Sequence, residues 1–265
     1  MSIKTSLTGL LACLGAVAAA PASAVIPFTV SMETEAPGIQ TSQSGFHAVG
    51  VETFDARAVA TNQSFISNFG GSAFTGTYTG VQVRNRDQYG GAGGTGRYAV
   101  TFTNAGYTLD LATQEPGGVT YFGFWLSALD LGNNVSFYKG GQLLFTFTSA
   151  HARNFINSLP NHSAYYCNPN AAFANRNCGQ PYTFLNFYAR NGTTFDRIHF
   201  SENPQVGGYE SDNHTVGQWN RISGTVIPVP GTFLDVPEPG TWAMLMVGFG
   251  LVGAVRRRRV QTVAA

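Results

Sequence analysis

Charged residues are scarce in this 265-residue chain. Asp, Glu, Lys and Arg make up 11% of it, against roughly 25% in an average soluble domain. Lys4 and four consecutive arginines lie near the termini, which leaves ten basic and thirteen acidic residues between Val25 and Val236, a net charge of −3. No basic stripe remains to neutralise phosphates, so the composition argues against a nucleic-acid partner. Few charges, 32 Gly and 20 Phe fit an extracellular β-protein better than a cytosolic enzyme.

Recognisable catalytic motifs are also lacking. There is no G-x-S-x-G elbow and no P-loop, and no metal-binding spacing such as H-E-x-x-H joins the histidines His47, His151, His162, His199 and His214. Residues 91–96 match G-x-G-x-x-G, but a predicted strand follows where phosphate binding needs a helix. We therefore expect no catalytic residues. A secreted polysaccharide-acting enzyme, which would use paired carboxylates, is the alternative.

Cysteine is rare, with three residues in the whole chain. Cys13 falls in an N-terminal leader, which leaves Cys167 and Cys178 in an Asn-rich stretch of the mature protein. An exported chain meets an oxidising compartment, so we predict a disulfide between these two residues. Closing a loop of about 12 residues stabilises a fold by roughly 2–3 kcal/mol in the chain-entropy model. A metal site or a free nucleophile is the alternative, although the spacing matches no zinc pattern.

The N-terminus has the three parts of a secretory leader. Lys4 supplies a positive charge, residues 7–20 are apolar, and Ala22-Ser23-Ala24 gives the A-x-A pattern that signal peptidase cleaves. We predict a signal peptide over residues 1–24 and Val25 as the first mature residue. Residues 10–13 loosely resemble a lipoprotein box ending at Cys13, but the apolar run continues past it to a better cleavage site.

The C-terminus carries a second targeting pattern. It has a Pro237-Glu238-Pro239 motif, then an uncharged stretch over residues 240–255, then Arg256, Arg257, Arg258 and Arg259. Sixteen residues of helix span about 24 Å, slightly short of a ~30 Å hydrocarbon core. We predict one transmembrane helix here. The arginines stop transfer at the membrane and keep the C-terminus cytoplasmic, so the main domain faces outward.

This tail resembles the PEP-CTERM sorting domain in all three parts: the Pro-Glu-Pro motif, a short Gly-bearing apolar helix and a terminal Arg run. The resemblance implies recognition and cleavage near the motif by exosortase, an integral-membrane cysteine transpeptidase. It also implies a Gram-negative host, in which an inner-membrane-anchored precursor becomes a surface or matrix protein. The predicted organisation is a signal peptide (1–24), an ectodomain (25–230), a linker (231–236), a sorting and anchor segment (237–259) and a cytoplasmic tail (260–265). An ordinary permanent anchor is the alternative.

The middle of the chain is rich in β-strand and turn signals. We predict strands within residues 97–103, 117–128, 182–189 and 194–201, and a hairpin over 134–148 that turns at Gly140-Gly141. Asn191-Gly192 predicts a second hairpin, between the strands at 182–189 and 194–201. Residues 150–159 predict a short helix. Many short strands with Gly and Asn turns indicate an all-β fold, an antiparallel β-sandwich of the jelly-roll type.

The middle also resembles the β-sandwich ectodomains that accompany such tails, on the segments 122–147, 186–203 and 207–217. In jelly-roll carbohydrate-binding modules, a structural Ca²⁺ often joins the first and last strands through carboxylates. By that resemblance, Glu33, Glu35 and Asp212 are candidate Ca²⁺ ligands, and solvated loop carboxylates are the alternative. Tyr165, Tyr166 and Trp219 are candidates for stacking on sugars, whereas Trp125 is expected in the core; the sequence specifies no ligand-binding residues beyond these.

Together these features predict an exported, exosortase-processed protein of the cell surface or extracellular matrix, with a structural or glycan-binding ectodomain and no enzymatic activity. The expected partners are signal peptidase and exosortase as processing enzymes, the inner membrane before processing, and extracellular polysaccharide, as in a biofilm.

Overall fold

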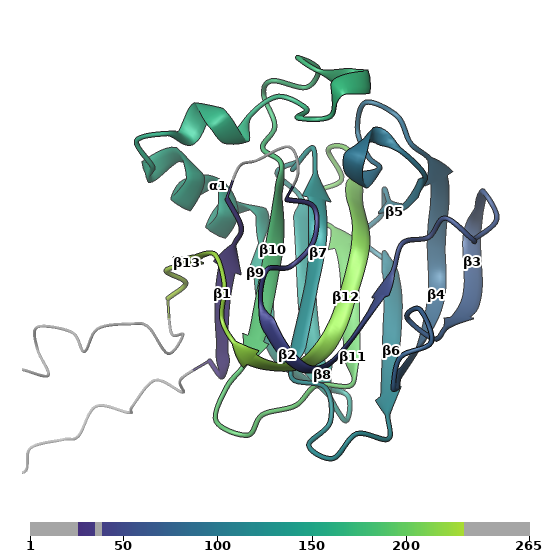
Figure 1. Ribbon diagram of the computed structural model, residues 1–265. Coiled ribbons are helices and arrows are strands. Elements are labelled where there is room, and N and C mark those ends of the chain that lie inside the picture. Colours follow the sequence, from purple (N-terminus) through teal and green to yellow (C-terminus); the bar gives the residue numbers. More distant parts are fainter. Residues whose placement is uncertain (1–25, 35–38, 231–265) are drawn as a thin grey trace, which may run out of the picture.

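The structure is a computed structural model that describes residues 26–34 and 39–230 (Figure 1). The predicted signal peptide, linker, sorting motif, arginine run and C-terminal tail therefore lie outside the described residues, as does Glu35. Within the residues that the structure describes, no helix combines the length and the apolar composition needed to cross a membrane.

Thirteen strands and one α-helix lie within the described residues. The strands are β1 (Phe28–Met32), β2 (Gly45–Glu52), β3 (Ala60–Ser67), β4 (Phe74–Asn85), β5 (Arg97–Thr101), β6 (Tyr107–Thr113), β7 (Tyr121–Ser127), β8 (Asn133–Lys139), β9 (Gln142–Thr148), β10 (Thr183–Ala189), β11 (Arg197–Glu202), β12 (Tyr209–Arg221) and β13 (Thr225–Ile227). Helix α1 spans Ser149–Ser158, and short 3-10 turns occur at Ala92–Gly94, His162–Tyr165 and Ala171–Phe173.

The strands form one continuous sheet with the order β13-β1-β10-β7-β12-β5-β4-β6-β11-β8-β9, to which β2 adds beside β12 and β3 beside β4. The pairings along this order are antiparallel, which confirms the all-β antiparallel prediction. The sheet curls into a half-barrel, so that β10 and β7 lie in front of β11 and β8 in Figure 1. The described strands belong to one continuous sheet, and the finer prediction of a two-sheet jelly-roll sandwich is not confirmed.

The curl arises where long strands change partners. One edge of β4 pairs with β6 over residues 74–79 and with β5 over residues 82–85. Gly80 lies between these two segments with a φ of 82°, a left-handed conformation that favours glycine. β12 likewise pairs with β5 at its start and with β2 further along. A strand that changes neighbours bends the sheet, and this brings the two ends of the strand order face to face.

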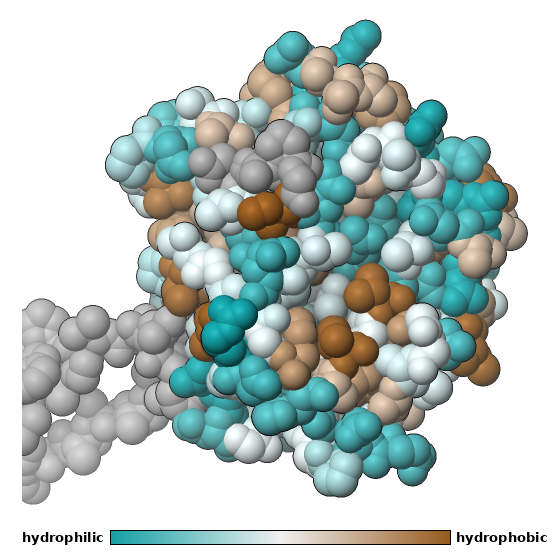
Figure 2. Space-filling view, in the orientation of Figure 1, coloured by the Kyte–Doolittle hydropathy of each residue, from teal (hydrophilic) through white to brown (hydrophobic). Residues whose placement is uncertain are grey.

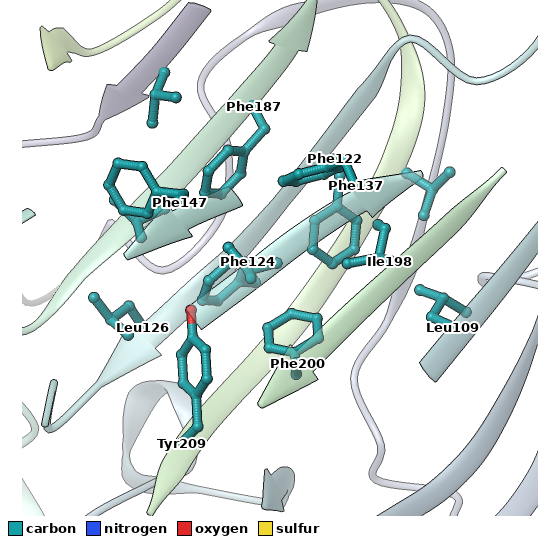
Figure 3. Close-up of a cluster of buried hydrophobic side chains, with 14 of the residues drawn as sticks. Leu109, Phe122, Phe124, Leu126, Phe137, Phe147, Phe187, Ile198, Phe200 and Tyr209 are labelled. Carbon is teal, nitrogen blue, oxygen red and sulfur yellow. The ribbon is translucent and has the colours of Figure 1, made fainter. Parts of the chain in front are cut away.

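Phenylalanine fills the space inside the curl (Figure 3). Alternate residues of each strand point inward, such as Phe122 and Phe124 of β7 and Phe200 of β11. The curled sheet has two facing walls, one containing β1, β10 and β7 and the other β6, β11 and β8. Rings from the two walls meet inside the curl. The Phe124 and Phe200 centroids are 5.2 Å apart, and the Phe28 and Phe137 centroids are 5.0 Å apart. This aromatic core is the main contact between the two walls.

Several local predictions are confirmed. The hairpin of β8 and β9 turns at Gly140-Gly141, where both residues have positive φ. Helix α1 and strands β5, β7, β10 and β11 fall within a residue or so of, or inside, the predicted ranges. Asp212, for which a solvated loop position was the alternative, lies within β12 itself.

The prediction of a second hairpin is wrong. The turn at Asn191-Gly192 exists, with φ values of 52° and 74°. However, β10 pairs with β1 and β7, whereas β11 pairs with β6 and β8. The turn therefore carries the chain from one wall of the curl to the other. A turn signal predicts a change of direction, but it does not determine which strand becomes the hydrogen-bonded neighbour.

Candidate functional site

The predicted disulfide is present between Cys167 and Cys178, with a sulfur–sulfur distance of 1.96 Å. It closes the Asn-rich loop between α1 and β10. Asn168 and Asn177 of this loop donate side-chain hydrogen bonds to the carbonyl of Gln88, over 2.9 and 2.6 Å. Because these bonds reach the β4–β5 connection, the loop is fastened to the end of the sheet as well as to itself.

The candidate Ca²⁺ ligands Glu33 and Asp212 lie in one row across the sheet, but they are not neighbours. The backbone N–H of Glu33 donates to Phe184, and Phe184, Trp125 and Asp212 are successive cross-strand partners. Three strand spacings of about 4.8 Å put their Cα atoms about 14 Å apart. The described residues contain no group of three His, Cys, Asp or Glu side chains placed to hold a metal ion. The Ca²⁺ site stays a prediction, and this geometry offers no position that Glu33 and Asp212 could share.

Each of these carboxylates has its own polar partners instead. Glu33 accepts hydrogen bonds from the Gln43 backbone at 2.9 Å, from Asn186 at 3.0 Å and from the Ser223 hydroxyl. Asp212 accepts from the backbone N–H groups of Ala92 and Asn213, at 2.8 and 2.7 Å. Burial raises the pKa of Asp212 to about 8. Both groups are therefore part of the folded framework rather than solvated loop carboxylates.

A second group of acidic residues, two buried and one half-buried, lies around Gly207-Gly208, just before β12. Glu202 accepts hydrogen bonds from the N–H groups of Val206 and Gly207, and Asp130 accepts from Gly208. Glu202 and Glu210 are 0% and 3% exposed, and their Oε2 atoms have no hydrogen-bond partner within the described structure. Burial raises the pKa of Glu202 and, well above its ordinary value, that of Glu210. These side chains hold protons at a pH where an exposed carboxylate would have lost them.

Replacing Glu210 with Gln is expected to stabilise the protein at alkaline pH. A carboxyl whose pKa is raised by folding favours the folded state at acid pH, and this contribution is lost as the pH rises through the raised pKa. The wild type should therefore melt at a lower temperature at pH 8 than at pH 5. Glu210→Gln should reduce that difference and melt several degrees higher at pH 8, since each kcal/mol is worth about 2–4 °C at this size. Glu115→Gln, in the β6–β7 connection, is the matched control and should leave the dependence of the melting temperature on pH unchanged. An equal effect of both variants would contradict the assignment of this dependence to Glu210.

The histidine most deeply placed in the structure belongs to the core. His214 is fully buried, stacks on Phe200 at 5.2 Å and bonds to the hydroxyls of Tyr78 and Ser211, at 3.0 and 2.9 Å. Burial lowers the pKa of His214 to about 3, so the ring is neutral at physiological pH. A Ser–His pair at hydrogen-bond distance is also the geometry of an activated nucleophile. Ser211 is itself 0% exposed, so no substrate reaches it in this conformation.

The aromatic residues proposed to stack on sugars are less available than expected. Tyr165 is 4% exposed and packs in the core, and Tyr166 is half-buried, with its hydroxyl donating to Asn157. Trp219 lies on β12, half-buried, where its indole N–H donates to the Ala189 carbonyl at 2.9 Å. Trp125 is 2% exposed, as predicted. Its Nε1 lacks a partner in a small recess beside Tyr182 and Pro169, which is suited to a single ordered water.

A polar, partly exposed surface is formed by the outer face of six neighbouring strands, β3, β4, β6, β11, β8 and β9, which we call the open panel. Cross-strand partners share a face of a sheet, so the register defines two rows of outward side chains. One row contains Ile66, Thr77, Asp110, Arg197, Tyr138 and Leu143. The other contains Ser64, Thr79, Thr108, His199, Ser136 and Thr146.

Hydroxyl groups dominate the open panel, and its charges cancel. Arg197 pairs with Asp110 at 2.5 Å, so the formal charges of Asp, Glu, Lys and Arg in the two rows cancel. The ring of Tyr138 is half-buried in the middle of the panel. Hydroxyls both donate and accept hydrogen bonds, and an aromatic ring offers an apolar face. The surface is suited to a neutral, hydroxyl-rich ligand.

Sequence reasoning missed the open panel, although one strand gave a signal. In β4, the exposed residues Thr75, Thr77 and Thr79 alternate with the buried residues Phe74, Gly76 and Tyr78. This period of two is typical of a strand with one solvated face. This alternation identifies one strand with a solvated face, whereas recognising the open panel requires the register of all six strands.

The face shown in Figure 2, which carries β2 and β12, is mainly hydrophilic, with hydrophobic residues in small separate patches.

Comparison with protein-family models matches residues 235–259 to the PEP-CTERM protein-sorting motif. No curated protein matches the chain significantly. The matched residues include the Pro-Glu-Pro motif, the apolar stretch and the arginines, which confirms the resemblance found in the sequence. A motif of this type implies export to the cell envelope or surface and processing by exosortase.

Proposed function

Because the chain carries a PEP-CTERM sorting motif, we propose that its ectodomain is a component of the bacterial surface or matrix that binds uncharged extracellular polysaccharide. The single observation that carries this proposal is the open panel, a partly exposed, hydroxyl-rich surface of six strands on which Arg197 and Asp110 pair. Signal peptidase would release the mature chain at Val25. Residues 240–259 would hold the precursor in the inner membrane until exosortase acts.

A neutral polysaccharide matches the panel in two ways. Threonine and serine hydroxyls exchange hydrogen bonds with sugar hydroxyls, and each can serve as donor or acceptor, so the surface tolerates different sugar orientations. The Tyr138 ring can pack against the apolar face of a sugar ring. A nucleic acid or an acidic polymer would instead need uncompensated cations, whereas Arg197 is already paired with Asp110.

Tyr138→Ala is expected to weaken polysaccharide binding by about 1–3 kcal/mol, or roughly 5- to 150-fold in Kd, if the ring is a central contact. The measurement is affinity electrophoresis through gels that contain neutral or acidic polysaccharides, followed by calorimetry on the best ligand. Tyr89→Ala removes a ring that is 40% exposed outside the panel and should leave binding unchanged. Binding that survives Tyr138→Ala and is lost with Tyr89→Ala would place the site elsewhere.

The protein used in the binding measurements can also be tested for catalysis. If polysaccharide is retained without release of reducing ends, the binding proposal is supported. Release of reducing ends would favour the alternative of a polysaccharide-acting enzyme. An acidic polymer retained more strongly than every neutral one would contradict the choice of ligand.

A further inference from the structure

The open panel ends in two strands that each have a free edge. β3 pairs with β4 alone and β9 pairs with β8 alone among the described strands. Each strand therefore presents a row of backbone N–H and C=O groups that its own sheet does not use. Such edges are templates for pairing with another chain. We propose that the partner is a second copy of this protein, and that β9 of one copy pairs with β3 of the next.

Two of the usual protections against pairing are missing from both edge strands, although each strand pair contains a register shift. Proteins commonly blunt an edge strand with charged residues or proline. The sequences of β3 (ATNQSFIS) and β9 (QLLFTFT) contain neither. The Arg57 guanidinium donates to the Ile66 carbonyl at 3.3 Å, and the Gln63 side chain donates to the Ala60 carbonyl at 3.1 Å, so each end of β3 has a local partner. Residues 61–65 of β3 and residues 142–147 of β9 are comparable in length.

Exposed apolar side chains mark the two edges. Ile66 is 69% exposed and Leu143 is 52% exposed. They lie at opposite ends of the same row of the open panel, so they point out of the same face. When β9 of one copy lies beside β3 of the next, Leu143 of the first copy comes close to Ile66 of the second. Each side chain then covers apolar surface of the other that is exposed in the single chain.

Strand direction allows this contact to repeat. The panel has six strands, and each runs antiparallel to its neighbour, so β3 and β9 run in opposite directions. A copy added with the same orientation places an antiparallel partner beside β9 and continues the open panel on the same side. A symmetric pair of β9 edges would leave both β3 edges unpaired. Head-to-tail addition uses both edges of every copy, and such a contact builds open filaments or rings.

The test is the mass distribution of the exported protein, measured by sedimentation velocity over rising concentration, with electron microscopy of the largest species. The wild type should form a ladder of assemblies that grows with concentration. Ile66→Lys and Leu143→Lys each add a charge to one edge, and each variant alone should remain monomeric. Thr108→Lys, which adds the same charge on β6, an inner strand of the panel, should assemble like the wild type.

Mixing the two edge variants gives the decisive result. Ile66→Lys keeps an intact β9 edge and Leu143→Lys keeps an intact β3 edge, so an equimolar mixture should form 1:1 dimers and nothing larger. Misfolding of either variant would not produce this complementation, and melting temperatures equal to the wild type would confirm that both fold. A wild type that stays monomeric, or that stops at a dimer, would overturn the proposal. A mixture that stays monomeric while the wild type assembles would also overturn it. Ile66 and Leu143 belong to the open panel, so polysaccharide binding is measured on the wild type, below the concentration at which it assembles. The proposed function can then fail or succeed independently.

Discussion

Replacing Pro237-Glu238-Pro239 with three alanines should leave nearly all of the protein as an intact precursor in the inner membrane. Proline disfavours helix at its own position and at the residue before it, so the sequence predicts an extended segment at the motif. An extended segment outside the membrane is what a processing enzyme can bind and cut. Alanine favours helix, so the replacement removes both the motif and the constraint that proline places on the backbone. The measurement is the intact mass of the surface-exposed and membrane fractions.

Two controls make this result specific to the motif. A chain truncated before Pro237 should be released, because no other membrane-spanning segment of the mature sequence is predicted. Wild-type chain in cells without exosortase should accumulate in the same form as the alanine variant. A wild-type mature product that still carries Arg256–Arg259 would show that residues 240–259 are a permanent anchor. In that case the processing step, and with it the temporary nature of the anchor, would be wrong.

Phe200→Ala should be among the most destabilising single substitutions in the domain. Phe200 is 0% exposed on β11 and its ring lies 4.8–5.2 Å from those of Tyr107, Phe124, Tyr209 and His214. Truncating a buried Phe costs about 3–5 kcal/mol, because transfer energy is lost and a cavity remains. Domains are stable by only about 5–15 kcal/mol. We expect a large fall in the denaturant midpoint, with little change in the slope of the transition.

Phe102→Ala provides the matched comparison. Phe102 follows β5 and is 38% exposed, and substitutions at such positions usually change the free energy of unfolding by about 0.5 kcal/mol or less. Phe200→Leu should lie between the two, since it retains part of the apolar volume. If Phe200→Ala cost no more than Phe102→Ala, the two walls of the curl would not meet at this ring, and the described packing would be wrong.

Local features of the fold could be predicted because they depend on a few adjacent residues. The β8–β9 hairpin follows from two strand-forming runs on either side of Gly140-Gly141, which adopt the positive φ that the turn requires. The disulfide follows from the presence of only two cysteines in an exported domain. The start of α1 has a similar local basis, since Thr148 and His151 form a reciprocal capping box.

Long-range pairing could not be predicted in the same way. The sequence predicted a hairpin of β10 and β11, and the turn between them exists. The two strands nevertheless pair with other strands, β10 with β1 and β7 and β11 with β6 and β8, because they lie in different walls of the curl. Glu33 and Asp212 were expected to meet at one cation, yet two strands lie between them. The choice among antiparallel neighbours depends on the packing of the whole aromatic core, and single segments contain little information about it.

The sequence by itself determined where this protein is sent. Sorting enzymes act on short, contiguous segments, so the Pro-Glu-Pro motif, the apolar stretch and the arginines could be recognised without knowledge of the fold. Only the tertiary structure decided which side chains share a surface. The open panel unites residues from Ser64 to Thr146 with Arg197 and His199, and its two free edges exist because β3 and β9 lie at its ends. These neighbours are set by the strand register, which is fixed when the core forms and not by any one segment of the chain.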